Sequence, residues 1–164
     1  MSSYEKTVTE IYYDREKTKP VTDYEVDEDG YAIYFKGDSL RDWIWYVFGE
    51  TKVFSHGHAI IFAYDNSTVR AYHNSTVRAY GNSKVNAYWY SEVYTYDNST
   101  VWAWESSKVD AYGNSKVFAN NHSKVDAHQN SEVRAYHNSK VYPYESSKVL
   151  ACDNSKVFAY DDSQ

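Results

Sequence analysis

The sequence is dominated by an eight-residue unit that repeats almost without interruption from Ser67 to Ala159. Typical units are AYHNSTVR, which begins at Ala71, and AYGNSKVN, which begins at Ala79. A fixed short period is typical of a solenoid, in which each unit covers the hydrophobic face of its neighbour. The repeat therefore constrains the fold more strongly than any local propensity does.

The unit itself predicts one strand and one corner. Ser, Val and Ala recur two residues apart, and residues two apart on a strand share a face. We expect these three side chains to point inward, while the Tyr position and the two residues beside Val point outward. The pair between Tyr and Ser, such as Gly81-Asn82, tolerates left-handed backbone angles and predicts the corner.

Counting back in steps of eight from Val69 reaches Ile61 and Val53, so residues 51–164 are predicted to form the solenoid. Two units per coil would give a two-layered roll of 16 residues, and three would give a triangular coil of 24 residues. Small inward side chains fill a thin two-layered core better, because protein interiors are close-packed. The charge and tyrosine ladders suit the 24-residue coil, which stays an alternative to the favoured 16-residue coil.

Residues 1–50 are predicted to form a small α+β lobe that caps the solenoid, so the expected fold class is mainly β. The runs Thr22–Val26 and Tyr31–Phe35 flank an Asp-Gly turn and predict a β-hairpin. A capping box at Ser39 and apolar residues at helical spacing predict a helix over residues 39–48. The apolar residues expected to cover the first coil are Leu40, Trp43, Ile44, Val47 and Phe48.

Composition and motifs favour a binding protein over an enzyme. The net charge is -6 and no basic cluster is evident, which disfavours direct nucleic-acid binding. No apolar run is long enough to span a membrane, and no signal segment precedes the repeat, so a cytoplasmic protein is expected. The repeated serines lack one activated copy, and His56 and His58 lack further convergent ligands. We therefore predict no catalytic residue, no metal site and no cofactor.

Three surfaces are candidate interaction sites. An outward Tyr-rich face would suit a protein partner, because Tyr and Trp are frequent hot-spot residues, although strand packing alone also explains it. An apolar rim near the last coils predicts a homodimer, and an acidic turn is either a binding epitope or a solvated loop. The face contains Tyr72, Tyr80, Tyr88, Tyr96, Trp104, Tyr112, Tyr136 and Tyr144; the rim contains Tyr142, Leu150, Phe158 and Tyr160; the turn contains Asp27, Glu28 and Asp29.

The unit Ala-Tyr-x-Asn-Ser-x-Val-x resembles that of octapeptide-repeat proteins found in phages, prophages and bacteria. The resemblance covers residues 51–164 and implies no catalytic residues. The chain is more loosely similar to pentapeptide-repeat solenoids, some of which inhibit DNA-handling enzymes by mimicking duplex DNA. Acidic and basic residues balance in the repeat region of this chain, so its surface lacks the strong negative charge that mimicry of DNA requires.

These features predict a non-enzymatic interaction protein of phage or mobile-element origin, acting in the host cytoplasm if it is phage-encoded. Its partner would be a protein of unknown identity, and inhibition of a host enzyme or a defence nuclease is one such role. Two alternatives stay open. A flat face could bind carbohydrate or ice, or the solenoid could be a spacer for the N-terminal lobe.

Overall fold

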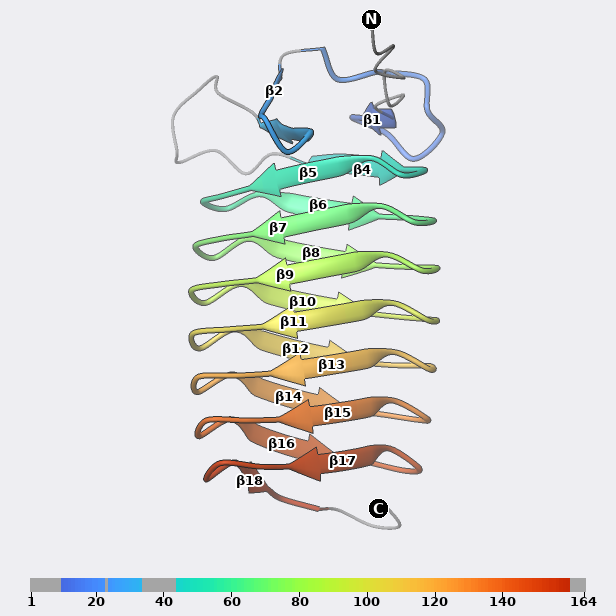
Figure 1. Ribbon diagram of the computed structural model, residues 1–164. Coiled ribbons are helices and arrows are strands. Elements are labelled where there is room, and N and C mark those ends of the chain that lie inside the picture. The colour runs from blue at the N-terminus through green and yellow to red at the C-terminus, as the bar shows by residue number, and fades with distance from the viewer. Residues whose placement is uncertain (1–9, 23, 34–43, 160–164) are drawn as a thin grey trace, which may run out of the picture.

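The computed structural model describes residues 10–22, 24–33 and 44–159, and within these ranges every regular element is a β-strand. The strands form two nine-stranded sheets, which lie face to face in a rod (Figure 1). Sheet A contains, in order, β1 (Glu10–Tyr12), β4 (Ile44–Phe48), β6 (Ile60–Ala63), β8 (Thr76–Ala79), β10 (Glu92–Thr95), β12 (Lys108–Ala111), β14 (Lys124–Ala127), β16 (Lys140–Pro143) and β18 (Lys156–Val157). Sheet B contains β17 (Lys148–Ala151), β15 (Glu132–Ala135), β13 (Lys116–Ala119), β11 (Thr100–Ala103), β9 (Lys84–Ala87), β7 (Thr68–Ala71), β5 (Lys52–Ser55), β3 (Tyr31–Ile33) and β2 (Glu25–Val26).

The protein is a parallel β-solenoid with 16 residues in each coil, as the volume of the inward side chains predicted. From β4 onward, each strand pairs in parallel with the strand one full coil later, for example Val93 with Val109 and Val101 with Val117. About seven coils follow one another, and at roughly 4.8 Å per coil they form a rod about 34 Å long. The 24-residue coil is thereby excluded.

The core between the sheets is built from the predicted Ser, Val and Ala positions. Val77, Val101 and Val125 have no exposed surface, and the side chains at the Ala position are fully buried as far as Ala135. The serines from Ser67 to Ser147 form a third buried column, and several of their hydroxyls donate hydrogen bonds to backbone carbonyls of the preceding coil. Ser107 Oγ, for example, lies 3.0 Å from the Ala87 oxygen. These side chains stabilise the stack, because buried hydroxyls need such partners.

The predicted helix over residues 39–48 is wrong for residues 44–48, the part of it that the structure describes. Ile44–Phe48 form strand β4, which pairs in parallel with β6 and places Trp45 opposite Ile61. Trp45 and Val47 are fully buried, whereas Ile44 is 42% exposed, which is the alternation of a strand. The rest of the predicted helix, residues 39–43 with Leu40 and Trp43, lies outside the described residues.

The strand forms because stacking on the next coil outweighs the local helix signals. Trp45 lies one further octad before Val53 and occupies the same inward column. Val47 occupies the Ala column, and Phe48 occupies the Tyr position. The coil pattern therefore extends back at least to Ile44, within the region expected to be a capping helix.

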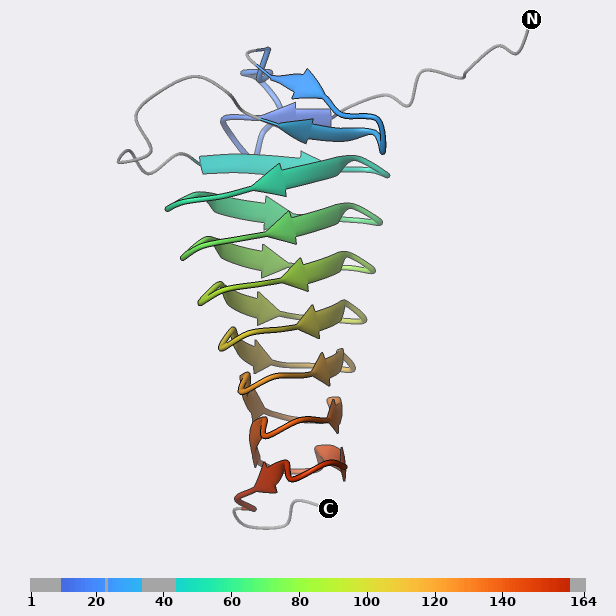
Figure 2. The ribbon, with the colours of Figure 1, turned by 60° about the vertical axis from the view of Figure 1, so that its left-hand side comes forward.

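In the described part of the chain, strands close the N-terminal end of the solenoid (Figure 2). Strand β1 pairs antiparallel with β4 and places Ile11 beside Val47. Strands β2 and β3 form the predicted hairpin, and β3 adds in parallel to β5. Ile11 and Val21 are buried there and extend the core beyond the first coil. The α+β lobe is thus replaced by strands that continue both sheets.

Candidate functional site

The residues of the predicted Tyr-rich face lie along two separate edges of the roll. Corner A leads from sheet A to sheet B, and corner B leads from sheet B to sheet A. The Tyr position immediately precedes each corner, so successive octads place their rings at alternate corners. Tyr80, Tyr96, Tyr112 and Tyr144 lie at corner A, and Tyr72, Tyr88, Trp104 and Tyr136 lie at corner B. The structure therefore contains no single face with all eight rings.

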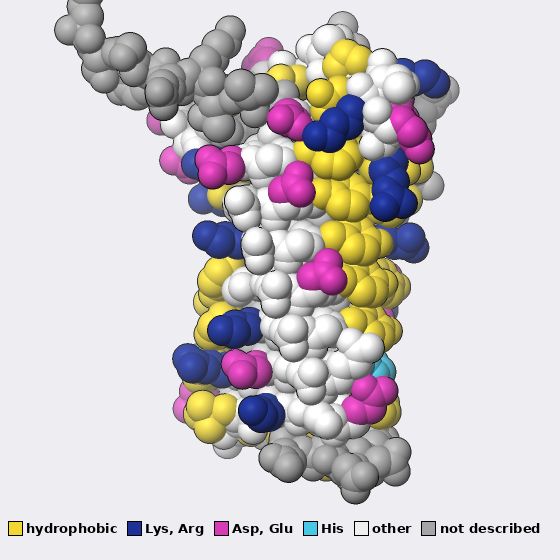
Figure 3. Space-filling model, turned by 90° about the vertical axis from the view of Figure 1, so that its right-hand side faces the viewer, with side chains coloured by type: hydrophobic (Ala, Val, Ile, Leu, Met, Phe, Trp, Pro, Cys, Tyr) yellow, Lys and Arg dark blue, Asp and Glu magenta, His cyan; other side chains and the backbone are white. Residues whose placement is uncertain are grey.

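At corner A the rings form one long stack, which is visible as a hydrophobic column in Figure 3. Centroids of neighbouring rings are 4.7–5.3 Å apart, and the rings are inclined by at most 11°. The members are Phe48, Tyr64, Tyr80, Tyr96, Tyr112, His128 and Tyr144. Burial raises the pKa of the Tyr64, Tyr80 and Tyr112 hydroxyls. Because ring faces contact ring faces, mainly ring edges remain for a ligand, which favours the structural role of this ladder.

The two corners have different backbones, which the sequence alone does not separate. At corner A only the first of the two central residues has a positive φ, as at Asp65 and Gly81. This is the pattern of a type II′ turn. At six of the seven described corner B turns both central residues have a positive φ, as at His73 and Asn74, which is the pattern of a type I′ turn; at the remaining turn only Gly57 does. Asn, Asp and Gly suit such positions, whereas large side chains are outliers there.

Several corner B turns place other residues there, such as Glu105 and His122, but one turn has two large aromatic residues, Trp89 and Tyr90. Their φ angles are +43° and +64°, so both aromatic residues are held in the left-handed region. Trp89 is 43% exposed and Tyr90 is 66% exposed. A residue in such a conformation costs of order 1–3 kcal/mol and persists only where its surroundings hold it. The turn thus displays two large aromatic side chains at a cost in backbone energy.

Neighbouring rings support this turn from the preceding coil. His73 stacks on Trp89 with 4.8 Å between ring centroids, and Tyr72 contacts Trp89 at 5.6 Å. On the following coil, Trp104 lies parallel to Tyr88. We call this set the aromatic corner; it consists of Tyr72, His73, Tyr88, Trp89, Tyr90 and Trp104. Trp89 and Tyr90 were absent from the sequence prediction, although no other octad has aromatic residues at both turn positions.

The outer faces of the two sheets differ in their balance of charged residues. The outer face of sheet B, from β5 to β17, carries six cationic residues and one carboxylate. The outer face of sheet A, from β8 to β18, carries five cationic residues and three carboxylates. The cations of sheet B are Lys52, Arg70, Lys84, Lys116, Arg134 and Lys148. The outer face of sheet B is therefore basic, although the net charge of the chain is -6.

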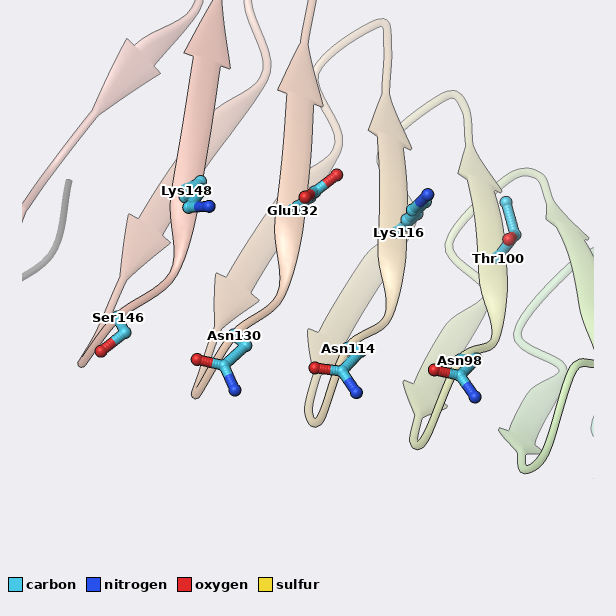
Figure 4. Close-up of a pocket in the computed structure, with 8 residues that line it drawn as sticks. All are labelled: Asn98, Thr100, Asn114, Lys116, Asn130, Glu132, Ser146 and Lys148. Carbon is cyan, nitrogen blue, oxygen red and sulfur yellow. The ribbon is translucent and has the colours of Figure 1, made fainter.

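A polar groove runs along the boundary between corner A and sheet B (Figure 4). Its cavity volume is about 540 Å³, and we call it the amide groove. Figure 4 shows its Asn side chains at successive turns, with the Lys, Thr and Glu side chains on the strands that follow. The lining residues are Asn98, Thr100, Asn114, Lys116, Asn130, Glu132, Ser146 and Lys148. All of them are polar, which distinguishes this groove from the aromatic corner.

The acidic turn at Asp27–Asp29 is engaged within the protein. The Asp27 carboxylate accepts hydrogen bonds from the backbone nitrogens of Asp29 and Tyr31, at 3.1 and 2.7 Å. Asp29 lies 3.4 Å from the Arg70 guanidinium and thereby joins the hairpin to sheet B. Glu28 stays exposed. These contacts favour the structural interpretation of the turn.

The predicted dimer rim lies at the last coil. Leu150 is 57% exposed and Phe158 is 41% exposed, and Phe158 stacks on Tyr142 with 5.0 Å between centroids. Leu150 also lines a cavity of about 370 Å³ on sheet B. Tyr160 lies outside the described residues. The homodimer stays a prediction.

The candidate metal ligands do not converge. His56 and His58 are exposed at one corner B turn, and across the described ranges no group of three or more His, Cys, Asp or Glu residues could hold a metal ion. Cys152 is a free, half-buried cysteine at a Tyr position. None of the described segments forms a helix that could cross a membrane.

Comparisons with family models, with curated proteins and with solved structures found no match. The fold defines the class of protein, a two-layered parallel β-solenoid, whose function depends on the side chains of its surfaces.

Proposed function

We propose that this chain is a non-enzymatic interaction protein that binds a protein partner through the aromatic corner. The observation that carries the proposal is the Trp89–Tyr90 turn. Type I′ corners favour short residues such as Asn and Gly, so the fold gains no turn stability from Trp or Tyr here. Backbone strain is concentrated at functional sites, and exposed Trp and Tyr are the residues most enriched in binding hot spots.

The charge of the neighbouring surface indicates what the partner presents. Tyr88 immediately follows β9, so the aromatic corner is continuous with the basic outer face of sheet B. A partner with an apolar pocket inside an acidic surface would complement both features, because charge complementarity accelerates association and selects partners. Inhibition of a host enzyme or a defence nuclease by a phage-derived protein in the host cytoplasm is a role of this kind.

Quantitative affinity capture tests the proposal. Wild-type protein and Tyr90→Asn and Trp89→Asn variants would be immobilised and exposed to a bacterial lysate. Each enriched protein would then be purified, and its dissociation constant measured against every variant. Leu150→Asn is the matched control, because it removes an exposed apolar side chain outside the aromatic corner.

The expected result is a partner whose affinity falls about 30-fold or more on loss of either aromatic residue, as for a hot spot worth at least ~2 kcal/mol. The control variant should bind as the wild type does. If every enriched protein binds the Trp89 and Tyr90 variants as tightly as the wild type, the aromatic corner is not the binding site.

A further inference from the structure

The amide groove presents unused hydrogen-bonding groups in regular order. Asn98, Asn114 and Asn130 are exposed, and within the described ranges their side-chain amides make no hydrogen bond. Each amide offers two donor hydrogens and an acceptor oxygen. Turn propensity explains why Asn occurs at these positions, but it does not use these side-chain groups. The groove therefore offers one free amide in each of three successive coils.

The lysines of this surface are also unpaired. Across the described segments, Lys84, Lys116 and Lys148 form no ion pair. On sheet A, by contrast, Lys108 pairs with Glu92 at 2.9 Å and Lys124 pairs with Asp126 at 2.8 Å. Lys116 and Lys148 of the groove, and Lys84 on the same face of sheet B, are thus available for an external anion.

The spacing of these lysines selects among linear anions. Lys84, Lys116 and Lys148 occupy every second coil of sheet B, so they are about 9.6 Å apart. Thr100 and Glu132 occupy the coils between them. An extended peptide repeats its side chains on one face every ~6.7 Å and falls out of phase with this row. Duplex DNA carries a charge every ~1.7 Å of its axis on two strands that wind around it, a spacing far closer than the ~9.6 Å between these lysines.

A β-linked chain of six-membered sugar rings advances by close to one coil for each ring. A carboxylate on alternate rings would then meet one lysine on every second coil. The sugar rings without a carboxylate would place hydroxyl groups beside Thr100 and Glu132. Hydroxyl or amide groups of every ring could form hydrogen bonds with the side chains of Asn98, Asn114 and Asn130. Oxygen-rich ligands of this type suit a groove lined entirely by polar groups.

We infer that the amide groove binds a linear polysaccharide that carries a carboxylate on every second sugar ring. The inference goes beyond the proposed protein partner. Both sites border the basic face of sheet B, but the groove variants leave the aromatic corner unchanged and the Trp89 and Tyr90 variants leave the groove unchanged. Each proposal can therefore fail while the other holds.

Titration calorimetry with a hyaluronate oligosaccharide tests the inference, because this β-linked polymer has one carboxylate for every two rings. We expect binding to the wild-type protein that weakens about tenfold or more in a Lys116→Gln/Lys148→Gln variant, through loss of charge-assisted hydrogen bonds. Asn114→Ala should also weaken it. A Lys108→Gln/Lys140→Gln variant is the matched control on sheet A and should bind as the wild type does.

Comparison ligands separate this inference from simple polyanion binding. A chitin oligosaccharide, polyglutamate and duplex DNA should each bind more weakly than hyaluronate. The inference is overturned if hyaluronate does not bind, if the two lysine variants behave alike, or if polyglutamate or DNA binds as tightly as hyaluronate with the same loss in the groove variant.

Discussion

Replacing Gly113 by Ala tests how tightly corner A packs. Gly113 has a φ of +69°, and a Cβ added to it would lie 3.0 Å from the Asp97 backbone nitrogen and 3.1 Å from the Asp97 oxygen. Those atoms belong to the preceding coil and cannot rotate away, since the Asn114 nitrogen donates to the same Asp97 oxygen at 2.8 Å. Separating them means stretching the hydrogen bonds between coils.

The expected loss has two parts. A left-handed conformation costs an L-residue about 1–2 kcal/mol, and the reduced freedom of Ala in the unfolded chain returns about 0.5–1 kcal/mol. Gly30→Ala carries only these two terms, because Gly30 has a φ of +81° and nothing lies within 4 Å of its added Cβ. It should lose about 0.5–1 kcal/mol. Gly113→Ala adds the backbone contacts, and we expect a loss of about 2–3 kcal/mol.

Urea unfolding followed by circular dichroism measures both losses, provided that the two variants unfold with the slope of the wild type. A midpoint that falls further for Gly113→Ala than for Gly30→Ala supports the packing argument. Equal midpoints for the two variants would refute it, because they would show that the coils have room for a methyl group at this corner.

Three further changes probe the sheets. Burial and the Asp126 carboxylate raise the pKa of Asp110, so the folded state holds this proton more tightly than the unfolded chain, and stability is lost as pH rises above 3.8. Asp110→Asn should therefore stabilise the protein by ~0.2–1 kcal/mol at neutral pH, and a gain that persists in acid would contradict this. Val117→Ala should cost about 2 kcal/mol in urea unfolding, while Val157→Ala should cost much less, because these valines are 1% and 41% exposed. Tyr80→Ser should lower stability by about 1–3 kcal/mol by removing two stacked contacts, and an unchanged melting temperature would show that the ladder contributes nothing.

The regular part of the fold could be predicted because one pattern determines it. The column of Val residues fixes the strand face, and the small Ser and Ala residues fix the thickness of the core. Together they favoured the 16-residue coil, which the pairing of Val93 with Val109 confirms. The hairpin of β2 and β3 followed from its Asp-Gly turn and is also confirmed.

The first coil was mispredicted because two periodicities overlap in it. Ile44, Val47 and Phe48 occur at helical spacing, whereas Trp45 and Val47 occur at strand spacing. Local signals cannot tell which pattern will be buried, and here the face that stacks on β6 decides it. Counting one more octad back from Val53 would have placed Trp45 in the inward column.

The candidate sites depend on geometry that the repeat hides. Alternate octads belong to opposite sheets, which divides the tyrosines between two edges and collects cations on sheet B. The backbone difference between the corners also separates Trp89 and Tyr90, which occupy left-handed positions, from the other exposed aromatic residues. Composition averages over these differences. The sequence prediction therefore named only Tyr72, Tyr88 and Trp104 of the aromatic corner, and no residue of the amide groove.

The central claim is that Tyr90 is kept for binding and contributes little to folding. The most direct test measures the free energy of unfolding of Tyr90→Asn together with its affinity for the captured partner. Tyr90 is 66% exposed in a strained turn that suits Asn, so the unfolding free energy should rise, or should fall no more than about 1 kcal/mol below the wild-type value, while affinity falls about 30-fold. A fall of about 2 kcal/mol or more in stability, with affinity unchanged, would contradict the claim.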